Sequence, residues 1–355
     1  MTKPLKFDFI VVYSNTNTYS ATNKKYTGTS PFSKKGNYAS CNSAYEYLLQ
    51  YSRRVGLHAA FSTVDDISGT GEFSSYWIFN KVWKRVQHTA QTFVIFDKFS
   101  NLTNVNASAY KMLIGTHNRI VLYHNHKVRT LFDNKLTTHS KLNQYMLPTV
   151  SIKLDSKKTI SKAKKALKIQ INNHLHTNDF THELILKDIF GGGGDHIYKI
   201  QTDARFKKIA ADTADVQFLL QPFIHTSNFN TGKMNGLTDL RVIIGNNTML
   251  QSYIRTAKKG DFRANIKQGG SIDYVPIHKI PQQVIDMIAQ IQKSTDLKDA
   301  LYTLDFICSQ NGNLYLIEGN ASPGLTWSNI EDEKRAKQLM RIIVKQLQMM
   351  SEKNL

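Results

Sequence analysis

Short, strongly apolar runs mark the first part of the chain. Residues 7–13 and 92–99 are mostly β-branched or aromatic, which is typical of buried strands. Residues 42–55 carry apolar side chains at helical spacing and stop at Gly56, which predicts a helix with a glycine end. Strands that alternate with helices predict an α/β domain with a largely parallel sheet over residues 1–130. The other elements predicted in this domain are two strands and a hairpin, at 58–62, 119–123 and 76–86.

A polar stretch between Ser14 and Asn37 interrupts this pattern. It is longer and more hydrophilic than an ordinary connection between a strand and a helix. We interpret the stretch either as a mobile loop near a functional site or as an insertion that decorates the domain.

A second module follows over residues 131–215, where helices and short strands alternate. Asp133 or Asn134 can cap a helix that runs to about Tyr145, because short polar side chains accept hydrogen bonds from the free N–H groups of a first helical turn. Farther along, Gly191–Gly194 joins two predicted strands. We therefore expect a compact α+β module. Its other elements are strands at 149–153, 183–188 and 196–200, and helices at 156–172 and 203–212.

The rest of the chain, residues 216–355, is rich in strands and ends in a helix. Two apolar runs flank Gly245-Asn246-Asn247, and two others flank Asn311-Gly312. Both patterns predict hairpins, because Asn and Gly adopt the conformations that tight turns require. Pro281 opens a helix with one apolar face. The remaining expectations are a strand at 217–224 and a final helix capped by Ser328 or Asn329.

Three oxygen-bearing side chains gather at the second hairpin. Asp305 is expected at the start of its first strand, and Glu318 and Asn320 stand two residues apart on its second strand. The latter two then point to the same face, and strand pairing would bring all three to one end of the hairpin. Carboxylate and amide oxygens are the ligands that Mg²⁺ prefers. An ordinary amphipathic hairpin with surface acids explains the pattern equally well.

Lys187 precedes the glycine run by a few residues, on a predicted strand. A lysine that faces a cleft and a glycine loop suit phosphate, because the ammonium supplies charge and glycine lets backbone N–H groups approach closely. The segment is neither a Walker loop nor a dinucleotide fingerprint, since no Gly-Lys-Ser/Thr follows and the glycines join two strands. A flexible turn is the alternative interpretation.

Two arginines and a proline-bearing strand add further candidate chemistry. Arg255 and Arg263 are suited to bidentate contacts with carboxylate or phosphate, although a surface salt bridge is the simpler explanation for either one. The strand Phe218–Ile224 contains Pro222, and proline belongs at a sheet edge. Free backbone groups there could pair with an adenine edge; a plain core strand is the alternative.

The formal net charge of +19 narrows the class of partners. Such an excess attracts polyanions, which include nucleotides, acidic peptides, nucleic acid and anionic membrane surfaces. Seven lysines fall between Lys153 and Lys168. They form either a solvated helix face or a landing surface for an acidic substrate.

The chain has two cysteines, Cys41 and Cys308, and 41% hydrophobic residues, as expected of a folded protein. Two cysteines cannot form a disulfide framework, and no Cys/His spacing indicates a zinc site. No apolar run approaches the ~20 residues of a membrane span. The first residues lack the apolar core of a signal peptide. We therefore expect a cytoplasmic protein in a reducing environment.

Six segments of the chain occur in the order found in the ATP-grasp superfamily. The chain resembles the RimK-like carboxylate–amine ligases of that superfamily over about residues 130–330, and it is most similar in the final hairpin and the Arg-Ala-Asn segment. The first 130 residues share only a general α/β character with the family's N-terminal substrate domain. The segments are Asn134-Lys135 before Leu147-Pro148-Thr149, Leu186-Lys187 with the glycine loop, Gln221-Pro222-Phe223-Ile224, Asp239-Leu240-Arg241, Arg255 with Arg263-Ala264-Asn265, and Asp305 with Glu318-Gly319-Asn320-Ala321-Ser322-Pro323-Gly324.

The resemblance implies an ATP-grasp fold of the α/β class. An N-terminal α/β domain, 1–130, would precede a two-part ATP-binding module, with an α+β lid over 131–215 and a metal-binding part over 216–355. The resemblance also implies ATP and two Mg²⁺ ions, with Mn²⁺ as an alternative ion. The lid would close over the reactants and exclude water.

The resemblance further implies roles for single residues. The metal ligands would be Asp305, Glu318 and Asn320. Arg255, Arg263 and Lys187 would be catalytic, with Arg255 steadying an acyl phosphate. The nucleotide would be held by Lys135 and Lys187 at the phosphates, by the loop glycines Gly191, Gly192 and Gly193, by Gln221, Pro222, Phe223 and Ile224 beside adenine, by Asp239 near the ribose, and by Arg263 and Asn265 at the γ-phosphate.

Two positions depart from the family pattern. Gly319 stands where the family usually has a β-branched or apolar residue; a side chain there would point away from the metals, so we expect activity to persist. The glycine loop lacks the usual Ser or Gln, which would loosen the lid.

We predict an ATP-dependent ligase that joins an anionic carboxylate substrate to an amine acceptor, such as an amino acid or a peptide, through an acyl phosphate. One alternative is another ATP-grasp enzyme that transfers phosphoryl groups. The other is a basic nucleic-acid-binding protein with a vestigial nucleotide site. Nucleic acid is the less favoured partner because the chain shows no RNA- or DNA-binding motif. No membrane span is expected, and an oligomer is compatible with the sequence.

Overall fold

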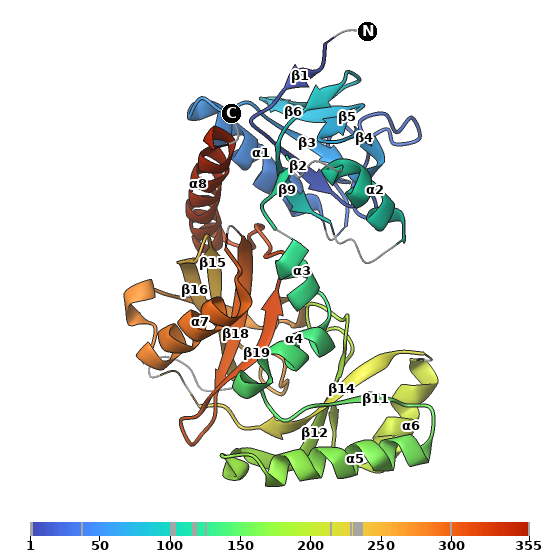
Figure 1. Ribbon diagram of the computed structural model, residues 1–355, viewed down its shortest axis with the longest axis vertical. Coiled ribbons are helices and arrows are strands. Elements are labelled where there is room, and N and C mark those ends of the chain that lie inside the picture. The colour runs from blue at the N-terminus through green and yellow to red at the C-terminus, as the bar shows by residue number, and fades with distance from the viewer. Residues whose placement is uncertain are drawn as a thin grey trace. The chain divides into compact units, whose positions relative to one another are not determined.

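The computed structural model describes residues 3–36, 38–99, 104–115, 119–124, 126–213, 215–227, 229, 237–298 and 300–353. The chain separates into two compact units, each with its own core (Figure 1). The predicted division into domains 1–130, 131–215 and 216–355 stays a prediction. The first unit consists of Met1–Arg129, Asp299–Leu301 and Ser322–Leu355, and the second of Thr130–Lys298 and Tyr302–Ala321.

A six-stranded sheet with the order β10-β9-β2-β3-β6-β7 organises the first unit. The strands β10, β9, β2 and β3 run parallel to one another, as predicted. The predicted hairpin, β6 and β7, extends the sheet in antiparallel fashion. The strands are β2 (Phe9–Tyr13), β3 (Ala59–Thr63), β6 (Tyr76–Asn80), β7 (Val82–Val86), β9 (Val94–Lys98) and β10 (Val121–Leu122).

Helices and a small sheet flank this central sheet. Ile10 and Val12 pack in one core with Tyr110 and Leu113 of helix α2 (Asn104–Ile114). Helices α1 and α8 pack against each other, α1 also against β3 and α8 against β9. Gly56 follows α1 with a φ of +87°, a conformation that glycine adopts without strain. The remaining elements are α1 (Ala39–Arg54), α8 (Ile330–Glu352) and the small sheet of β1 (Leu5–Lys6), β8 (Ala90–Gln91), β5 (Glu72–Phe73) and β4 (Ile67–Gly69).

The polar stretch after β2 is fastened to the first unit. Arg85 donates three hydrogen bonds to backbone carbonyl groups of the stretch. Trp77 Nε1 donates a fourth to the carbonyl of Tyr19, and Phe32 is fully buried. These contacts favour the predicted insertion over a loose loop; Asn37, at its end, lies outside the described residues.

The second unit begins with a four-stranded sheet that helices α5 and α6 cover on one face (Figure 1). We name it the α5–α6 sheet. Leu186 packs into the core under these helices, whereas Ile185 and Lys187 on either side line a cavity on the other face, as the alternation of a strand requires. The elements are β11 (Val150–Lys153), α5 (Lys157–Asn172), β12 (Phe180–Asp188), β13 (Ile197–Ile200), α6 (Asp203–Asp212) and β14 (Gln217–Ile224).

Strand β14 lies inside the α5–α6 sheet rather than at its edge. Its pairing with β11 runs from Gln217 to Leu220 and ends there. Pairing with β12 continues to Pro222 and, after a bulge, to Ile224. The prediction of an edge strand is therefore wrong for the first half of β14. It holds for the half that contains the proline, because that half has no partner in β11.

A five-stranded sheet with the order β17-β16-β15-β18-β19 completes the second unit. Asn246 and Asn247 make the first predicted hairpin turn with positive φ angles of +48° and +61°. Asp305 lies in the middle of β18, not at the start as predicted, because the strand begins at Leu301. The strands are β15 (Thr238–Gly245), β16 (Thr248–Thr256), β17 (Ser271–Val275), β18 (Leu301–Cys308) and β19 (Leu314–Asn320).

Asp179 ties the two sheets of the second unit together. Its carboxylate accepts hydrogen bonds from Asn311, Asn313 and Tyr315 at the hairpin of β18 and β19, at 2.6–2.9 Å. A small apolar cluster around Leu147 lies next to this contact. The base of the α5–α6 sheet is thus held against the hairpin.

Of the three remaining helices, α4 and α7 belong to the second unit, and α3 spans the division after Arg129. Asn134 caps α4 by accepting hydrogen bonds from Leu136 N and Thr137 N, and Pro281 precedes α7 as predicted. None of the described helices combines the length and the apolar content that crossing a membrane would require. The helices are α3 (His126–Phe132), α4 (Lys135–Leu142) and α7 (Gln282–Thr295).

Candidate active site

A cavity opens between the two sheets of the second unit; the space within it, open solvent included, is about 870 Å³. One end is lined by apolar side chains and the other by charged ones. Most of the predicted site residues line it, namely Lys135, Lys187, Gln221, Pro222, Phe223, Ile224, Asp239, Arg255, Arg263, Asn265 and Glu318. The predicted residues that do not line it are Gly191, Gly192, Gly193, Asp305 and Asn320.

Gln221 presents an unsatisfied acceptor at the apolar end of the cavity. Its Nε2 donates to Thr149 Oγ1 at 2.8 Å, but its Oε1 is buried without a hydrogen-bond partner. A buried acceptor without a partner costs free energy. The atom therefore marks a place where a donor group of a ligand would be stabilised.

Lys199 holds the ring of Phe223 at the same end. The ammonium Nζ lies 3.9 Å from the ring centroid and 2.7 Å from Glu183 Oε2. The cation–π contact and the ion pair together orient the ring. The sequence pattern did not single out Lys199. The one indication was its position on β13, the strand that pairs with β12.

Two lysines, Lys135 and Lys187, line the charged end near each other. Lys135, the first residue of α4, donates from Nζ to the carbonyl of Gly191 and lies 3.9 Å from Glu318 Oε1. Burial lowers the pKa of Lys187 to about 8; the charge of Glu318 opposes this shift, and the charge of Lys135 adds to it. The charged end therefore holds two lysines close together. Lys187 loses its proton more readily than an ordinary lysine because its pKa is lowered.

The glycine loop is joined to the segment before β17. Arg263 forms a bidentate pair with Asp261, at 3.1 and 2.8 Å, and its Nη1 lies 3.4 Å from the carbonyl of Gly194. Lys267 pairs with Asp195, and Gln268 donates to the same carboxylate at 3.2 Å. These contacts bring the loop next to Arg263 and Asn265, although its glycines do not line the cavity.

A buried network of two carboxylates and two guanidinium groups underlies the cavity. Arg255 binds both oxygens of Asp239, at 2.6 and 2.9 Å, and one oxygen of Asp305, at 2.7 Å. Arg241 binds both oxygens of Asp305, at 2.7 and 2.5 Å. Arg241 had no predicted role. It stands two residues from Asp239 on β15, so both side chains point to the same face of the sheet, and this spacing was the indication in the sequence that they share a network.

The two carboxylates of this network differ in their electrostatic environment. Burial would raise the pKa of Asp305, but Arg241 and Arg255 outweigh burial and lower it. For Asp239, burial and the nearby charge of Asp305 outweigh Arg255, and the pKa is raised. Asp305 is therefore the more firmly ionised of the two.

Strand pairing brings the predicted metal ligands together. Asp305 lies directly opposite Glu318, and Asn320 lies opposite Thr303, two residues away. Glu318 lines the cavity with 23% of its side chain exposed, whereas Asp305 is fully buried. The buried Nδ2 of Asn320 has no hydrogen-bond partner, so no hydrogen bond from that atom fixes the amide.

This donor set fits a hard cation that is completed by ligand oxygens. Asp305 accepts three hydrogen bonds, and an ionised carboxylate offers about four acceptor positions. Among the described residues, no group of three or more His, Cys, Asp or Glu side chains could hold a metal alone. Two carboxylates and an amide therefore leave room for water and phosphate oxygens, which Mg²⁺ commonly retains.

Gly319 leaves room for an aromatic ring. A Cβ atom there would lie 2.2 Å from two ring carbons of Phe132, which is buried and makes a tilted ring contact with Tyr302. We expect Gly319→Val to lower the free energy of unfolding by about 3 kcal/mol, because overpacking a filled site forces neighbours apart. Chemical denaturation measures this. Phe132→Ala should rescue the variant, so the double variant should lose less than the sum of both single losses; strict additivity would contradict the explanation.

The family model of the RimK-like ATP-grasp domain matches residues 133–343. Among curated relatives, a "Probable alpha-L-glutamate ligase 2" of Hahella chejuensis is 28% identical over 179 residues, which cover 46% of this chain and 53% of the relative. A "Probable alpha-L-glutamate ligase" of Shewanella halifaxensis is 33% identical over 144 residues, covering 40% of this chain and 28% of the relative. The chain thus matches about half or less of the length of these relatives.

Solved ATP-grasp structures resemble nearly the whole chain. D-alanyl-alanine synthetase A from Vibrio cholerae aligns with a TM-score of 0.56 and 14% identity, covering 92% of this chain and 91% of its own. A RimK domain ATP-grasp protein from Sphaerobacter thermophilus gives 0.55 and 9%, with coverage of 96% and 99%. The ATP-grasp ligase PsnB, in complex with a minimal precursor, Mg and ADP, gives 0.53 and 12%, with coverage of 98% and 99%.

Because the identities are this low, the structural likenesses establish the fold alone. It is the predicted ATP-grasp fold, a mixed α/β fold with several sheets. The family model spans more than half of the chain and contains every residue that lines the cavity. The chain therefore belongs to the RimK-like ATP-grasp family.

Proposed function

We propose that this protein is an ATP-dependent ligase that joins a carboxylate to an amine. One observation carries the proposal: a single cavity unites an apolar end with an unsatisfied acceptor and a charged end with paired lysines and Glu318. These residues come from segments far apart in the chain. Such an arrangement suits a nucleotide triphosphate, with its flat base at one end and its phosphates at the other.

The apolar end suits the adenine base. Phe223 and Ile185 offer faces for a flat ring, and the free Oε1 of Gln221 suits an exocyclic amine. The half of β14 from Gln221 to Ile224 has no partner in β11, so its backbone can pair with the edge of the base. Asp239 also lines the cavity and would lie near the ribose, with both of its oxygens held by Arg255.

The charged end suits the phosphates. Lys135 and Lys187 would neutralise phosphate oxygens, and Arg263 and Asn265 would contact the γ-phosphate beneath the glycine loop. Asp305, Glu318 and Asn320 would hold Mg²⁺, which would supply charge for the phosphate oxygens. We propose two ions, with Mn²⁺ as an alternative.

The chemistry needs positioning and charge more than a protein nucleophile. A carboxylate oxygen of the substrate attacks the γ-phosphorus of ATP, ADP leaves, and an acyl phosphate forms. The amine then attacks the acyl carbon, loses a proton, and phosphate leaves. Arg255 would steady the negative charge that develops at the acyl group. Arg263 and Lys187 would do so at the transferred phosphoryl group.

We propose an amino acid or an acidic peptide as substrate. The net charge of +19 favours an anionic carboxylate, and two relatives are named as alpha-L-glutamate ligases. A cytoplasmic location, expected from the two cysteines, stays a prediction.

A screen of products tests the proposed function. The protein is incubated with Mg·ATP and with amino acids and acidic peptides, singly and in pairs. We expect ADP release that depends on both a carboxylate and an amine, and a product whose mass equals the two substrates minus water. A stable phosphorylated acceptor would instead establish phosphoryl transfer. ADP release that requires no amine acceptor and gives no amide product would also contradict the ligase proposal.

The low pKa of Lys187 predicts weaker nucleotide binding at high pH. Below a pH of about 8 the free lysine is charged; above it the lysine must take up a proton to face phosphate. We expect the Kd of a non-hydrolysable ATP analogue to rise about tenfold per pH unit above that value. Isothermal titration in buffers of different ionisation enthalpy measures both the Kd and the proton uptake.

Lys187→Arg is the matched control for this pH dependence, because arginine keeps its charge throughout the range. Its affinity should vary little with pH, whatever its absolute value. A wild-type profile as flat as that of the variant would show that Lys187 does not face the phosphates.

A further inference from the structure

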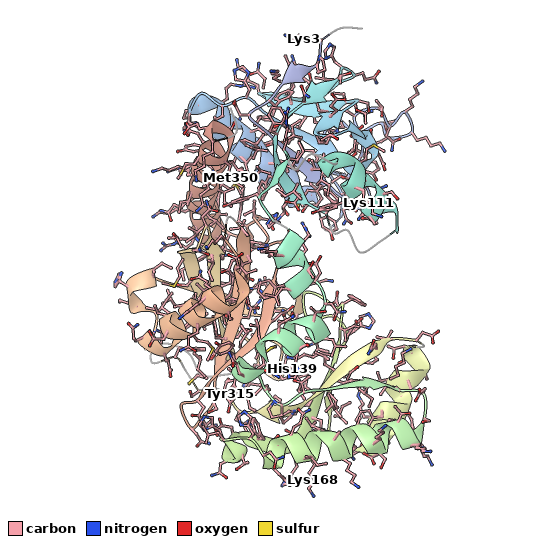
Figure 2. All side chains as sticks on the ribbon, viewed as in Figure 1. Lys3, Lys111, His139, Lys168, Tyr315 and Met350 are labelled. Carbon is pink, nitrogen blue, oxygen red and sulfur yellow. The ribbon has the colours of Figure 1, made fainter. Side chains whose placement is uncertain are left out.

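The outer face of α5 carries an unusual concentration of positive charge. We name the exposed side chains Lys157, Lys158, Lys162, Lys165 and Lys168 the lysine face. They lie opposite Ala163 and Leu167, which are buried against the α5–α6 sheet. Figure 2 shows Lys168 on the side of α5 that points away from this sheet. No residue of the lysine face lines the cavity of the candidate active site.

The charges of the lysine face repel one another. Lys158 and Lys162 stand four residues apart, and Lys162 and Lys165 three apart, spacings at which like charges destabilise a helix. Helix α5 contains no acidic residue. Among the described residues, no acidic side chain forms an ion pair with any lysine of the face; the neighbouring Lys164 does pair, with Asp203.

The helix dipole makes this arrangement still less favourable. Lys157 and Lys158 occupy the first turn of α5, where the dipole favours anions and disfavours cations. Helix α8 shows the opposite arrangement on its own solvated face. Acids fill its first turn, and Glu331 and Glu333 pair with basic residues one turn later. A solvated helix of this protein can therefore balance its charges, and α5 does not.

We propose that the lysine face docks an acidic polypeptide that also carries aliphatic side chains. Negative charge would relieve the repulsion within α5. Ile169 follows Lys165 by one turn on the same face and is 54% exposed, and Leu175 beyond the helix is 87% exposed. These side chains offer apolar contacts beside the charges. The lysine face spans about 16 Å along the helix axis, the length of about five residues of an extended peptide.

The same residues favour a polypeptide over a nucleic acid. Single strands of nucleic acid are held by aromatic side chains that stack on bases and by arginine. Helix α5 contains neither an aromatic residue nor arginine. The proposal stands apart from the ligase function, because the face and the cavity share no residue.

Charge reversal on the lysine face tests the proposal. The full chain is titrated against a fluorescein-labelled peptide of repeated Glu-Glu-Leu, against an all-Glu peptide of equal charge, and against poly(U) RNA, with binding followed by anisotropy. We expect K158E/K162E/K165E to weaken binding of the Glu-Glu-Leu peptide by about tenfold or more. The matched control K24E/K25E/K34E alters the same charge at exposed lysines of the first unit and should change it less than about threefold.

Two further measurements make the outcome decisive. I169N should weaken the Glu-Glu-Leu peptide more than the all-Glu peptide, because only the former has aliphatic side chains. K158E/K162E/K165E should unfold at about the same temperature as the wild type, because a negative charge at position 158 suits the dipole while positions 158, 162 and 165 keep like charges at the same spacings. If the two triple variants weaken binding of the Glu-Glu-Leu peptide equally, binding depends only on net charge and the proposal is overturned. If the protein binds poly(U) RNA more tightly than the peptide, and K158E/K162E/K165E loses that RNA binding, the lysine face is a nucleic-acid site instead.

Discussion

Glu318→Gln should lower the rate of ADP formation by about 10³-fold or more, since one group that stabilises developing charge contributes about that much. Glu318 is the predicted metal ligand that faces the cavity, and its side chain is 23% exposed. Glutamine keeps the size of the side chain but removes the negative charge that would hold the cation. The initial rate of ADP release in the presence of the identified substrates measures the effect.

The fold of this variant should be intact. Among the described residues, the basic side chain nearest to Glu318 is Lys135, at 3.9 Å, and the hydrogen bonds of the buried arginine network do not include Glu318. Thermal unfolding of the free protein should therefore change little, whereas stabilisation by Mg²⁺ with a non-hydrolysable ATP analogue should be lost. Glu331→Gln, which removes an exposed ion pair on α8, is the control and should turn over normally. Normal turnover of Glu318→Gln would remove the assigned metal role.

Arg255→Met should lower the free energy of unfolding by about 3–5 kcal/mol, the usual cost of removing one partner from a buried ion pair. Arg255 is 4% exposed and sits between Asp239 and Asp305. Its loss would leave Asp239 buried without the guanidinium that binds both of its oxygens. Asp305 would keep Arg241. Urea denaturation followed by circular dichroism measures the change.

Two controls separate charge burial from other causes. Arg263→Met breaks a bidentate pair with Asp261 whose arginine is 28% exposed, and should cost only about 0–1 kcal/mol. Arg255→Met combined with Asp239→Leu should recover most of the loss, because replacing both partners by apolar groups is often nearly neutral. Equal losses in Arg255→Met and Arg263→Met would show that burial does not decide the strength of these pairs.

Local signals predicted most of the elements that build the cavity. The strand at 217–224 and the helix at 203–212 have the predicted bounds. Of the two candidates predicted for each helix, Asn134 and Asn329 are the caps, and this was nearly predictable because capping depends on neighbours within one turn. By contrast, β1, β5 and β8 have two residues each and were not predicted. Strands that short show no periodicity of their own; β10 is equally short, but it lies within the longer segment 119–123 that predicted it.

The placement of the candidate site was predictable in part. The hairpin turn at Asn311-Gly312 predicted correctly that Asp305 and Glu318 would meet, and they pair directly. It did not predict that Arg241 and Arg255 occupy the oxygens of Asp305. Sequence spacing describes one strand at a time, and this network joins β15, β16 and β18 through neighbours set by the sheet order.

The amino-acid sequence by itself determined the types of element, the turns and caps between them, and the family, because each depends on residues close together in the chain or on motifs in a fixed order. Only the tertiary structure decided which charges are buried and what they contact. Burial lowers the pKa of Lys187 to about 8, and the ring of Phe132 fills the space beside Gly319. Both effects arise from side chains that long-range packing brings together, and desolvation and steric contact act through space rather than along the chain.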